Sequence, residues 1–408
     1  MSKNKGKKRI AFVLTGGYSI GGAESRFVNA FNFLLDNSKD YEYFLFVSGK
    51  RLAALCKHGL LEESKKNIII NCPVFYQKLL KKRYAKSFLL YSQENKHIKL
   101  GLIKKIIIRL IRWIHFVYNV FFLLVFVIRK KIDVIHPVTE GSPPSGIVKT
   151  FMPGIFLVST YLSLNPSYHK TGLFYLYSSQ YLSLKKSDMI DVLGVSYLKA
   201  LKKTGFKINP DKTVITKCSF VKPFNVSHKK EKVIVFSGRL IDQKNPLLFV
   251  EAARLVINSG SYGVKFLILG TGPLKNSLEN RIKLYNIDDF IKIDYCFNQS
   301  EVLSKSLIFC SLQNIDNYPS QSLLQAMYAQ NGIVATNFGE TGKLIKHNET
   351  GLLVDPNPAD ISRQIIYLLK NPEKLKTMGQ KASELVAREH NIIRFSNYLN
   401  SIYTDLIN

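Results

Sequence analysis

Cysteine is sparse and scattered in this sequence of 408 residues. The five cysteines form no Cys-x-x-Cys pair; they are Cys56, Cys72, Cys218, Cys296 and Cys310. An odd, widely spaced set argues against a disulfide framework and against a structural zinc site. We therefore expect the chain to work in a reducing compartment.

A long apolar run near the amino terminus is also lacking. The stretch Ile10–Leu14 follows several lysines but is too short for the core of a secretory signal peptide, so we expect a first β-strand there. Hydrophobic residues make up 46% and charged residues 21% of the chain. This composition excludes a disordered or collagen-like chain, and the length predicts two or three folded domains.

Acidic residues are the third scarcity, with 29 Asp+Glu against 58 Lys+Arg and a net charge of +29. The imbalance is concentrated in residues 1–222, where 37 basic and 12 acidic residues leave +25, against +4 for residues 223–408. A uniformly basic fold would not divide in this way. The first half is expected to lie beside an anionic partner, and a nucleic acid, a phospholipid surface and a polyanionic substrate all remain open.

Short apolar runs alternate with helical patterns along the whole chain. This alternation predicts α/β domains with doubly wound parallel sheets. The runs expected to be strands are Arg9–Leu14, Tyr43–Val47, Asn67–Asn71, Ile132–His136, Gly154–Thr160, Met189–Val195, Lys232–Phe236, Lys265–Leu269, Ile291–Tyr295, Leu307–Cys310 and Gly332–Ala335.

The polar segment Lys222–Lys230 is the natural linker between two such domains. We predict an amino-terminal domain over residues 1–222 and a carboxyl-terminal domain over residues 223–388. Residues 389–408 are expected to form a closing helix that packs back on the first domain.

An apolar segment stands out near residues 100–130. Trp113–Ile128 holds sixteen uncharged residues, and the stretch Lys65–Arg112 before it carries thirteen Lys or Arg and one acid, Glu94. Sixteen helical residues span about 24 Å, which is marginal for a hydrocarbon core of about 30 Å. Three interpretations stay open: a core helix, an amphipathic helix on an anionic membrane, and a transmembrane span.

Two loops that follow predicted strands carry residues suited to a diphosphate. The glycine-rich turn Gly16–Glu24 can bring backbone N–H groups to a phosphate at a helix start, although such turns also occur without a ligand. Arg239 and Lys244 stand just before a helix that should open with Asn245 as the N-cap and Pro246 at its first position. Two cations at that place suit a diphosphate, the alternative being solvated surface charges.

Two further loops have the same position relative to a strand. Gly270 and Gly272 form a turn that would let a base or ribose approach the backbone, or else a plain turn. The segment Asp316–Met327 closes a loop and opens a helix after Leu307–Cys310. His136 follows another strand and is a candidate on the acceptor side, with a structural role as the alternative.

These motifs resemble family 4 of the retaining glycosyltransferases (glycosyl transferases group 1), whose GT-B fold has two Rossmann-like domains facing a cleft. The resemblance is strongest from Val233 to Pro356, through FSGRLIDQKNP, LGTGP, NYPSQSLLQAM and GETGKLIKHNETGLLVDP. It extends to the first half through GGAE and SDMIDVLGVSYLKALKKTG.

The resemblance implies a role for most of these residues. Arg239 and Lys244 would neutralise the donor diphosphate, and the other loops would surround the rest of the donor. The donor-binding residues so implied are Gly21, Gly22, Arg239, Lys244, Gly270, Gly272, Ser320, Gly339, Glu340 and Thr341.

The pair of acidic residues usual in the family is altered here. Gln325 replaces the second of two glutamates, which normally binds the donor ribose, and Asn317 stands eight positions earlier in place of the first. Asp316 could supply the missing carboxylate if the loop is one residue longer. We therefore take Asp316, Asn317 and Gln325 as the catalytic candidates. The segment Ser159–Ser163 also departs from the family, because many relatives carry a histidine there.

The resemblance implies sugar transfer with retained anomeric configuration, from a UDP- or GDP-sugar and without a cofactor. No metal is expected, in agreement with the absence of an Asp-x-Asp pair from the sequence. The basic half and the apolar helix favour a lipid-linked or polysaccharide acceptor, and a peripheral location on the cytoplasmic face of an anionic membrane.

Two alternatives are retained. The altered glutamates would also fit a degenerate relative that binds a nucleotide sugar or a partner enzyme without transfer. The basic half would permit nucleic-acid binding, but the chain contains no recognisable nucleic-acid module, so we expect no such partner.

Overall fold

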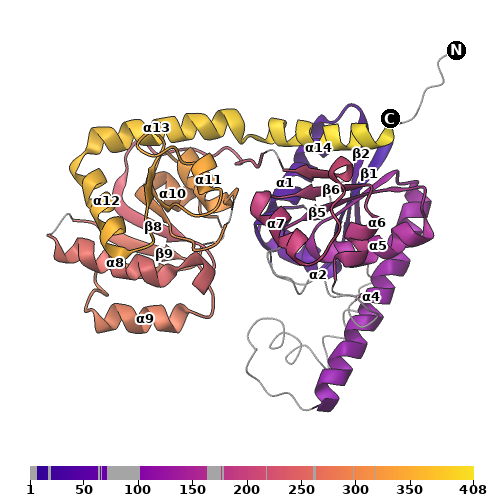
Figure 1. The fold of residues 1–408 in the computed structure, drawn as a ribbon, viewed down its shortest axis with the longest axis horizontal. Helices are drawn as coiled ribbons and strands as arrows, with labels where there is room; N and C mark the ends of the chain where they lie inside the picture. The colour runs from indigo at the N-terminus through magenta and orange to yellow at the C-terminus, as the bar shows by residue number, and fades with distance from the viewer. Residues whose placement is uncertain are drawn as a thin grey trace. The chain divides into compact units, whose positions relative to one another are not determined.

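Two parallel sheets organise the chain in a computed structural model (Figure 1). The structure describes residues 7–16, 20–62, 65, 67–70, 102–162, 176, 179–216, 218–260, 263–296, 298–316 and 318–408. The first unit comprises residues 1–216 and 396–408, and the second comprises residues 217–395. The predicted domain boundaries, after residues 222 and 388, differ from these divisions. The second division lies inside the last helix, Ile392–Ile407, rather than before it.

The sheet of the first unit has the strand order β3-β2-β1-β4-β5-β6-β7, and all its neighbouring strands are parallel. The strands are β1 (Lys8–Leu14), β2 (Tyr41–Val47), β3 (Ile68–Ile70), β4 (Val134–Pro137), β5 (Phe156–Tyr161), β6 (Met189–Val192) and β7 (Thr213–Ile215). The helices are α1 (Gly22–Asn37), α2 (Gly49–Lys57), α4 (Leu102–Lys130), α5 (Ser142–Phe151), α6 (Tyr181–Lys186), α7 (Val195–Lys203) and most of α14 (Ile392–Ile407).

The sheet of the second unit has the order β10-β9-β8-β11-β12-β13, again with parallel neighbours. The strands are β8 (Glu231–Ser237), β9 (Lys265–Leu269), β10 (Ile291–Asp294), β11 (Ser306–Ser311), β12 (Gly332–Thr336) and β13 (Leu352–Val354). The helices are α8 (Pro246–Asn258), α9 (Lys275–Leu284), α10 (Ser300–Lys305), α11 (Gln321–Tyr328), α12 (Pro358–Lys370) and α13 (Pro372–Glu389).

Helices cover both faces of this second sheet, which explains why its strands are continuous apolar runs. Ile234 of β8 is buried in the cluster that includes α8, α9 and α12, whereas its neighbour Val235 is buried with α10, α11 and α13. Successive side chains of a strand point to opposite faces, so a strand covered on both sides needs apolar residues throughout.

The apolar segment of residues 113–128 lies in the long helix α4. One side of its carboxyl-terminal half is buried with β1, β2 and β4, through Leu123, Phe126 and Val127. The segment Arg109–Lys130 is long and apolar enough to cross a membrane, yet only 28% of its most apolar stretch is buried. The core-helix interpretation therefore accounts for one side of α4 only.

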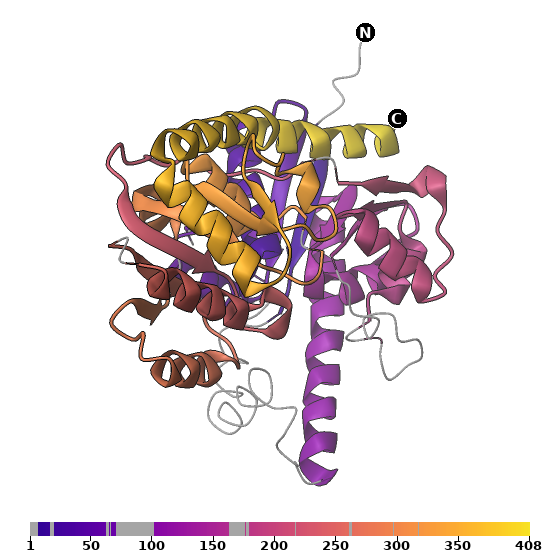
Figure 2. The same ribbon diagram turned by 60° about the vertical axis from the view of Figure 1, so that its left-hand side comes forward.

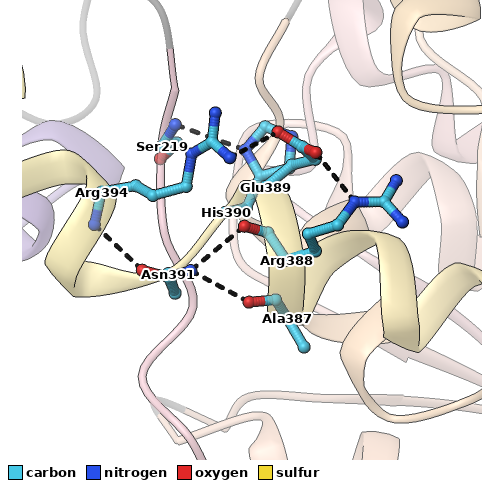
Figure 3. A network of polar contacts seen from close by, with 7 residues as sticks. All are labelled: Ser219, Ala387, Arg388, Glu389, His390, Asn391 and Arg394. Atoms are coloured by element: carbon cyan, nitrogen blue, oxygen red, sulfur yellow. Dashed lines mark hydrogen bonds and ion pairs between the residues drawn. The ribbon is translucent and has the colours of Figure 1, made fainter.

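The chain passes from one unit to the other at residues 216–217 and again at residues 395–396. Near these passages, within the second unit, the two segments are hydrogen-bonded to each other (Figure 3). The Ser219 amide donates to His390 Nδ1 at 3.4 Å, and the Val221 amide donates to the His390 carbonyl at 2.9 Å. Asn391 Oδ1 accepts from the Arg394 amide at 2.9 Å and starts α14. The two connecting segments are thus held to each other where they join the second unit.

Candidate functional site

Four predicted features lie at one edge of the second sheet. The turns that carry Arg239, Gly270, Asp316 and Gly339 follow β8, β9, β11 and β12, which are neighbours in the strand order. The carboxyl ends of parallel strands meet at one edge, where ligands bind in open α/β sheets. The structure therefore brings these sequence-predicted loops together.

Arg239 and Lys244 lie in the turn between β8 and α8. Arg239 is exposed, and Lys244 is partly buried beside Gly238. Burial, and then the charge of Arg239, lowers the pKa of Lys244 to about 8. Two cations that disfavour each other in this way are stabilised by an anion placed between them. The pair is therefore suited to a diphosphate.

The start of α8 is confirmed at Pro246, with Asn245 as its N-cap. The Asn245 side chain makes no capping hydrogen bond. Its backbone is left-handed instead, with φ 56°. Asparagine tolerates that conformation better than most residues, so the residue type serves the backbone turn here.

The glycines after β9 have a packing role within the second unit. A Cβ on Gly270 would lie 1.9 Å from the Gly238 carbonyl oxygen, and one on Gly272 would lie 2.5 Å from the Leu240 carbonyl oxygen. The Leu240 amide donates to the Thr271 carbonyl at 2.9 Å. These glycines let two loops of the chain pack together. They thereby help to set the shape of the turn that carries Arg239.

Asp316 braces the loop after β12. Its Oδ1 accepts hydrogen bonds from the amides of Tyr318 and Glu340, both at 3.2 Å. Gly339 has φ +58°, and a Cβ there would lie 2.5 Å from the Asp316 Cγ. Asp316 is buried, and no partner within the described residues reaches its Oδ2. The carboxylate thus positions the turn at Gly339–Glu340.

The remaining residues of that turn are held by short local contacts. Thr341 Oγ1 donates to the Phe338 carbonyl at 2.7 Å, and Glu340 forms an ion pair with Lys343. Ser320 is buried at the N-cap position of α11, and Gln325 is partly buried one turn into that helix. The candidate Asn317 lies outside the described residues.

Gly21 and Gly22 lie in the first unit, at the start of α1. The Gly21 amide donates to Glu24 Oε2 at 2.9 Å, and Glu24 Oε1 accepts from Thr139 Oγ1 at 3.0 Å. Glu24 therefore fixes the end of the glycine-rich turn against the segment after β4. The sequence analysis missed this role, although a glutamate three positions after an N-cap is the known spacing for a bond back to the cap amide.

His136 is not placed to meet an acceptor, which corrects the sequence-based candidate. Its side chain is fully buried, with Nδ1 2.7 Å from the Tyr403 hydroxyl and Nε2 2.6 Å from Thr160 Oγ1. Burial, reinforced by the charge of Arg26, lowers the pKa of His136 to about 3. The neutral imidazole joins β4 and β5 to α14, so its role is structural.

The same cluster continues to a buried carboxylate. Asp191 of β6 accepts from the hydroxyls of Tyr398 at 2.6 Å and Thr216 at 2.8 Å. Burial raises the pKa of Asp191, and these hydrogen bonds oppose the rise. Helix α14 thus supplies polar partners to the interior of the first unit.

Metal ligands do not gather in the described ranges. No group of three or more His, Cys, Asp or Glu side chains there could hold a metal ion. Metal independence stays a prediction from the sequence.

The second unit resembles a known protein family. Residues 220–385 match the family model for glycosyl transferases group 1. A Campylobacter jejuni protein named GalNAc-alpha-(1->4)-GalNAc-alpha-(1->3)-diNAcBac-PP-undecaprenol alpha-1,4-N-acetyl-D-galactosaminyltransferase is 27% identical over 46% of this chain and 52% of its own length. The Escherichia coli UDP-Gal:alpha-D-GlcNAc-diphosphoundecaprenol alpha-1,3-galactosyltransferase is 24% identical over 46% and 51%. The chain thus matches about half the length of these relatives.

Solved structures resemble the whole chain. A structure of TarM from S. aureus, with fondaparinux, alpha-GlcNAc-glycerol and UDP, has a TM-score of 0.69 at 15% identity and covers 98% of this chain and 100% of that one. Anabaena HepE in complex with UDP has a TM-score of 0.67 at 13% identity, covering 97% and 100%. These similarities confirm the predicted GT-B fold of two parallel-sheet α/β domains.

Proposed function

We propose that this chain, whose residues 220–385 match the family model for glycosyl transferases group 1, transfers a sugar from a nucleotide-sugar donor to a lipid-linked saccharide, with retention at the anomeric carbon. The observation that carries the proposal is the cationic turn of Arg239 and Lys244 at the carboxyl edge of the second sheet. The neighbouring turns, braced by Asp316, complete that edge.

Arg239 and Lys244 have a direct chemical use in such a reaction. When the bond between the anomeric carbon and the diphosphate oxygen breaks, the electron pair stays on the diphosphate, whose negative charge grows. Preorganised cations at the place where charge develops lower the barrier more than they stabilise the bound donor. The lowered pKa of Lys244 means that the free site already disfavours its second positive charge, so a dianionic ligand is its natural complement.

Gln325 and Asp316 have different uses in this proposal. Gln325 would donate or accept a hydrogen bond at the donor ribose, as a neutral replacement for the usual glutamate. Asp316 is buried and accepts from two backbone amides, so we assign it to positioning Gly339 and Glu340. The donor sugar would then be held by the loop rather than by the Asp316 carboxylate itself.

The donor and acceptor are proposed from the relatives' printed names. Both C. jejuni and E. coli relatives are named for undecaprenol-diphosphate-linked substrates, and the E. coli one for a UDP-sugar. The TarM and HepE structures contain UDP. We propose a UDP-sugar donor, a GDP-sugar being the alternative, and a polyprenol-diphosphate saccharide acceptor. For such an acceptor we propose a location at the cytoplasmic face of a membrane. We also propose that the reaction needs neither a metal nor another cofactor.

A second candidate function follows from the altered acidic pair. Gln325 lacks the carboxylate that normally binds ribose, so a protein that binds a nucleotide sugar without transferring it remains the competing proposal. The two functions share donor binding at Arg239 and Lys244. They differ in whether nucleoside diphosphate is released.

The deciding experiment measures release of nucleoside diphosphate from a panel of nucleotide sugars, with a membrane lipid extract as acceptor. Arg239→Ala is compared with Lys376→Ala, which removes an exposed cation from α13 far along the chain from the site. Release from one donor that is lost in Arg239→Ala and kept in Lys376→Ala supports the transferase. Donor binding without any release supports the non-transferring protein.

A further inference from the structure

The outward side of α4 is apolar along most of its length. Six large apolar side chains on it have exposed fractions between 47% and 59%; they are Ile106, Leu110, Ile114, Val117, Phe121 and Ile128. Their spacing of three, four or seven residues places them on one face of the helix. We call this set the α4 stripe. It extends over 23 residues, from Ile106 to Ile128, or about 33 Å.

In the carboxyl-terminal half of α4, the opposite side faces the core of the first unit. The buried residues Leu123, Phe126 and Val127 pack with the sheet of the first unit. Arg112 and Asn119 follow one another on this side by helical spacing. An ordinary surface helix turns its apolar face to the core and its polar face to water. In α4 a second apolar face points away from the core.

The views agree on where the helix lies within its own unit. The amino-terminal half of α4 extends away from the sheet of the first unit in both (Figure 1 and Figure 2). This half carries Ile106, Leu110 and Ile114 of the α4 stripe. A contiguous apolar patch of this size marks an interaction surface.

The charges around the α4 stripe select its partner. Helix α4 contains no acidic residue, and its exposed basic side chains include Arg109 near one end and Arg129 and Lys130 at the other. The sequence immediately before it adds seven Lys or Arg and one acid over residues 71–101. An apolar face bordered by cations matches a bilayer surface that contains anionic lipids. Two copies of α4 would instead place like charges side by side.

The packing of α4 also decides how it would meet the bilayer. A membrane-spanning helix has to be surrounded by lipid or by other spanning segments over its whole length. Leu123, Phe126 and Val127 are buried against the sheet of the first α/β unit, so spanning would require them to leave that core. We infer that α4 lies in the plane of an anionic membrane with the α4 stripe inserted at the level of the headgroups and upper acyl chains.

This inference deepens the proposed function, since it names the surface that would hold the enzyme at its acceptor. It rests on the proposed membrane location but not on turnover. The single tryptophan of the chain, Trp113, lies in α4 and is partly exposed. Its indole is packed edge-on against Phe116, with ring centroids 5.7 Å apart. Trp113 fluorescence therefore reports on α4 without a label.

The experiment mixes the full chain with vesicles of neutral phosphatidylcholine, or of phosphatidylcholine with one third phosphatidylglycerol, at low and high salt. The test variant is Leu110→Glu combined with Phe121→Glu, both in the exposed α4 stripe. The matched control is Leu284→Glu, which places the same charge at an apolar side chain 72% exposed on α9. Circular dichroism verifies that the variants fold.

We expect flotation with the anionic vesicles only, weakened by salt, together with a blue shift of Trp113 emission. The double variant should lose at least tenfold in affinity and the blue shift, whereas Leu284→Glu should behave as the parent. Unchanged binding of the double variant overturns the inference. So does resistance of the bound parent to extraction by alkaline carbonate, which indicates a spanning helix. A lipid-free dimer of the parent, absent from the double variant, would assign the stripe to a second copy.

A second measurement on the same samples tests the proposed function independently of this inference. Nucleoside diphosphate release is measured with a detergent-solubilised acceptor, so that no vesicle is needed. Vesicle binding without release from any donor leaves the α4 inference in place and rejects the transferase. Release without vesicle binding rejects the α4 inference alone.

Discussion

The carboxylate of Asp316 occupies the space where a side chain on Gly339 would have to lie, with its Cγ 2.5 Å from that hypothetical Cβ. The same carboxylate accepts the amide of the next residue, Glu340, at 3.2 Å. Gly339 and Asp316 come from loops after different strands, so each loop depends on the other for its shape. The donor edge of the second sheet is therefore one connected structure.

Gly339→Ala should damage this connection. The new methyl group meets Asp316, and φ +58° is strained for any residue with a Cβ. We expect the free energy of unfolding to fall by about 1–3 kcal/mol, measured by urea denaturation, with loss of donor-dependent turnover. Gly342→Ala is the control, because a Cβ there meets no atom within 4 Å. An equal loss in both variants would contradict the bracing role of Asp316.

Affinity for nucleoside diphosphate should fall as pH rises above the pKa of Lys244, which is about 8 in the free protein. Deprotonation removes one of the two cations, and a bound diphosphate holds the proton more tightly. The expected loss approaches about tenfold per pH unit until the pKa of the bound form is reached. Isothermal titration calorimetry from pH 7 to 10 measures it. Lys244→Arg should abolish the dependence, since arginine stays charged; a persistent slope would point to another group.

His136 should make the fold sensitive to acid. Its pKa is about 3 in the folded protein, below the usual 6.5, so the unfolded chain binds more protons between these values. Stability from this residue is complete above pH 6.5 and falls by at most about 1.4 kcal/mol per pH unit down to pH 3. Asp191, whose pKa is raised, acts in the opposite direction. Urea denaturation from pH 4 to 7 should show a smaller slope for His136→Gln than for the parent; equal slopes would refute the assignment.

Gln325→Glu tests the altered acidic position. If Gln325 meets the donor ribose, a carboxylate there forms a stronger, charge-assisted hydrogen bond. We expect up to about tenfold tighter binding of UDP, which corresponds to 1.4 kcal/mol. Gln380→Glu on α13, at an exposed position, adds the same charge elsewhere and should have no effect. Unchanged affinity in Gln325→Glu would remove that residue from the donor site.

The strands of the second unit were predictable because they are buried on both faces. Lys265–Leu269 was predicted with the observed bounds, and the strand at Lys232–Phe236 differs by one residue at each end. Strands β7 and β13 were missed, because each has three residues and Thr213–Ile215 is only partly buried. A run of that length carries too little apolar pattern to distinguish it from a turn.

The loops show what sequence alone leaves open. Gly270 and Gly272 have the spacing of a ligand-binding turn, but the space beside them is filled by the backbone of Gly238 and Leu240. His136 has the position of a site residue at a strand end. It is hydrogen-bonded, however, to Tyr403 of α14, which lies 267 residues further along the chain. In both cases the decisive neighbour comes from a distant segment, which a local motif does not contain.

Helix α14 has a consequence for the order in which the protein is made. Asp191 accepts a hydrogen bond from Tyr398, and His136 shares one with Tyr403. The ribosome adds both tyrosines only after the whole second unit. Domains usually fold as they emerge, the amino-terminal one first. Here the first unit cannot complete the hydrogen bonds of His136 and Asp191 until residues 396–408 are available. The second unit is therefore the first that can reach its complete native structure during synthesis.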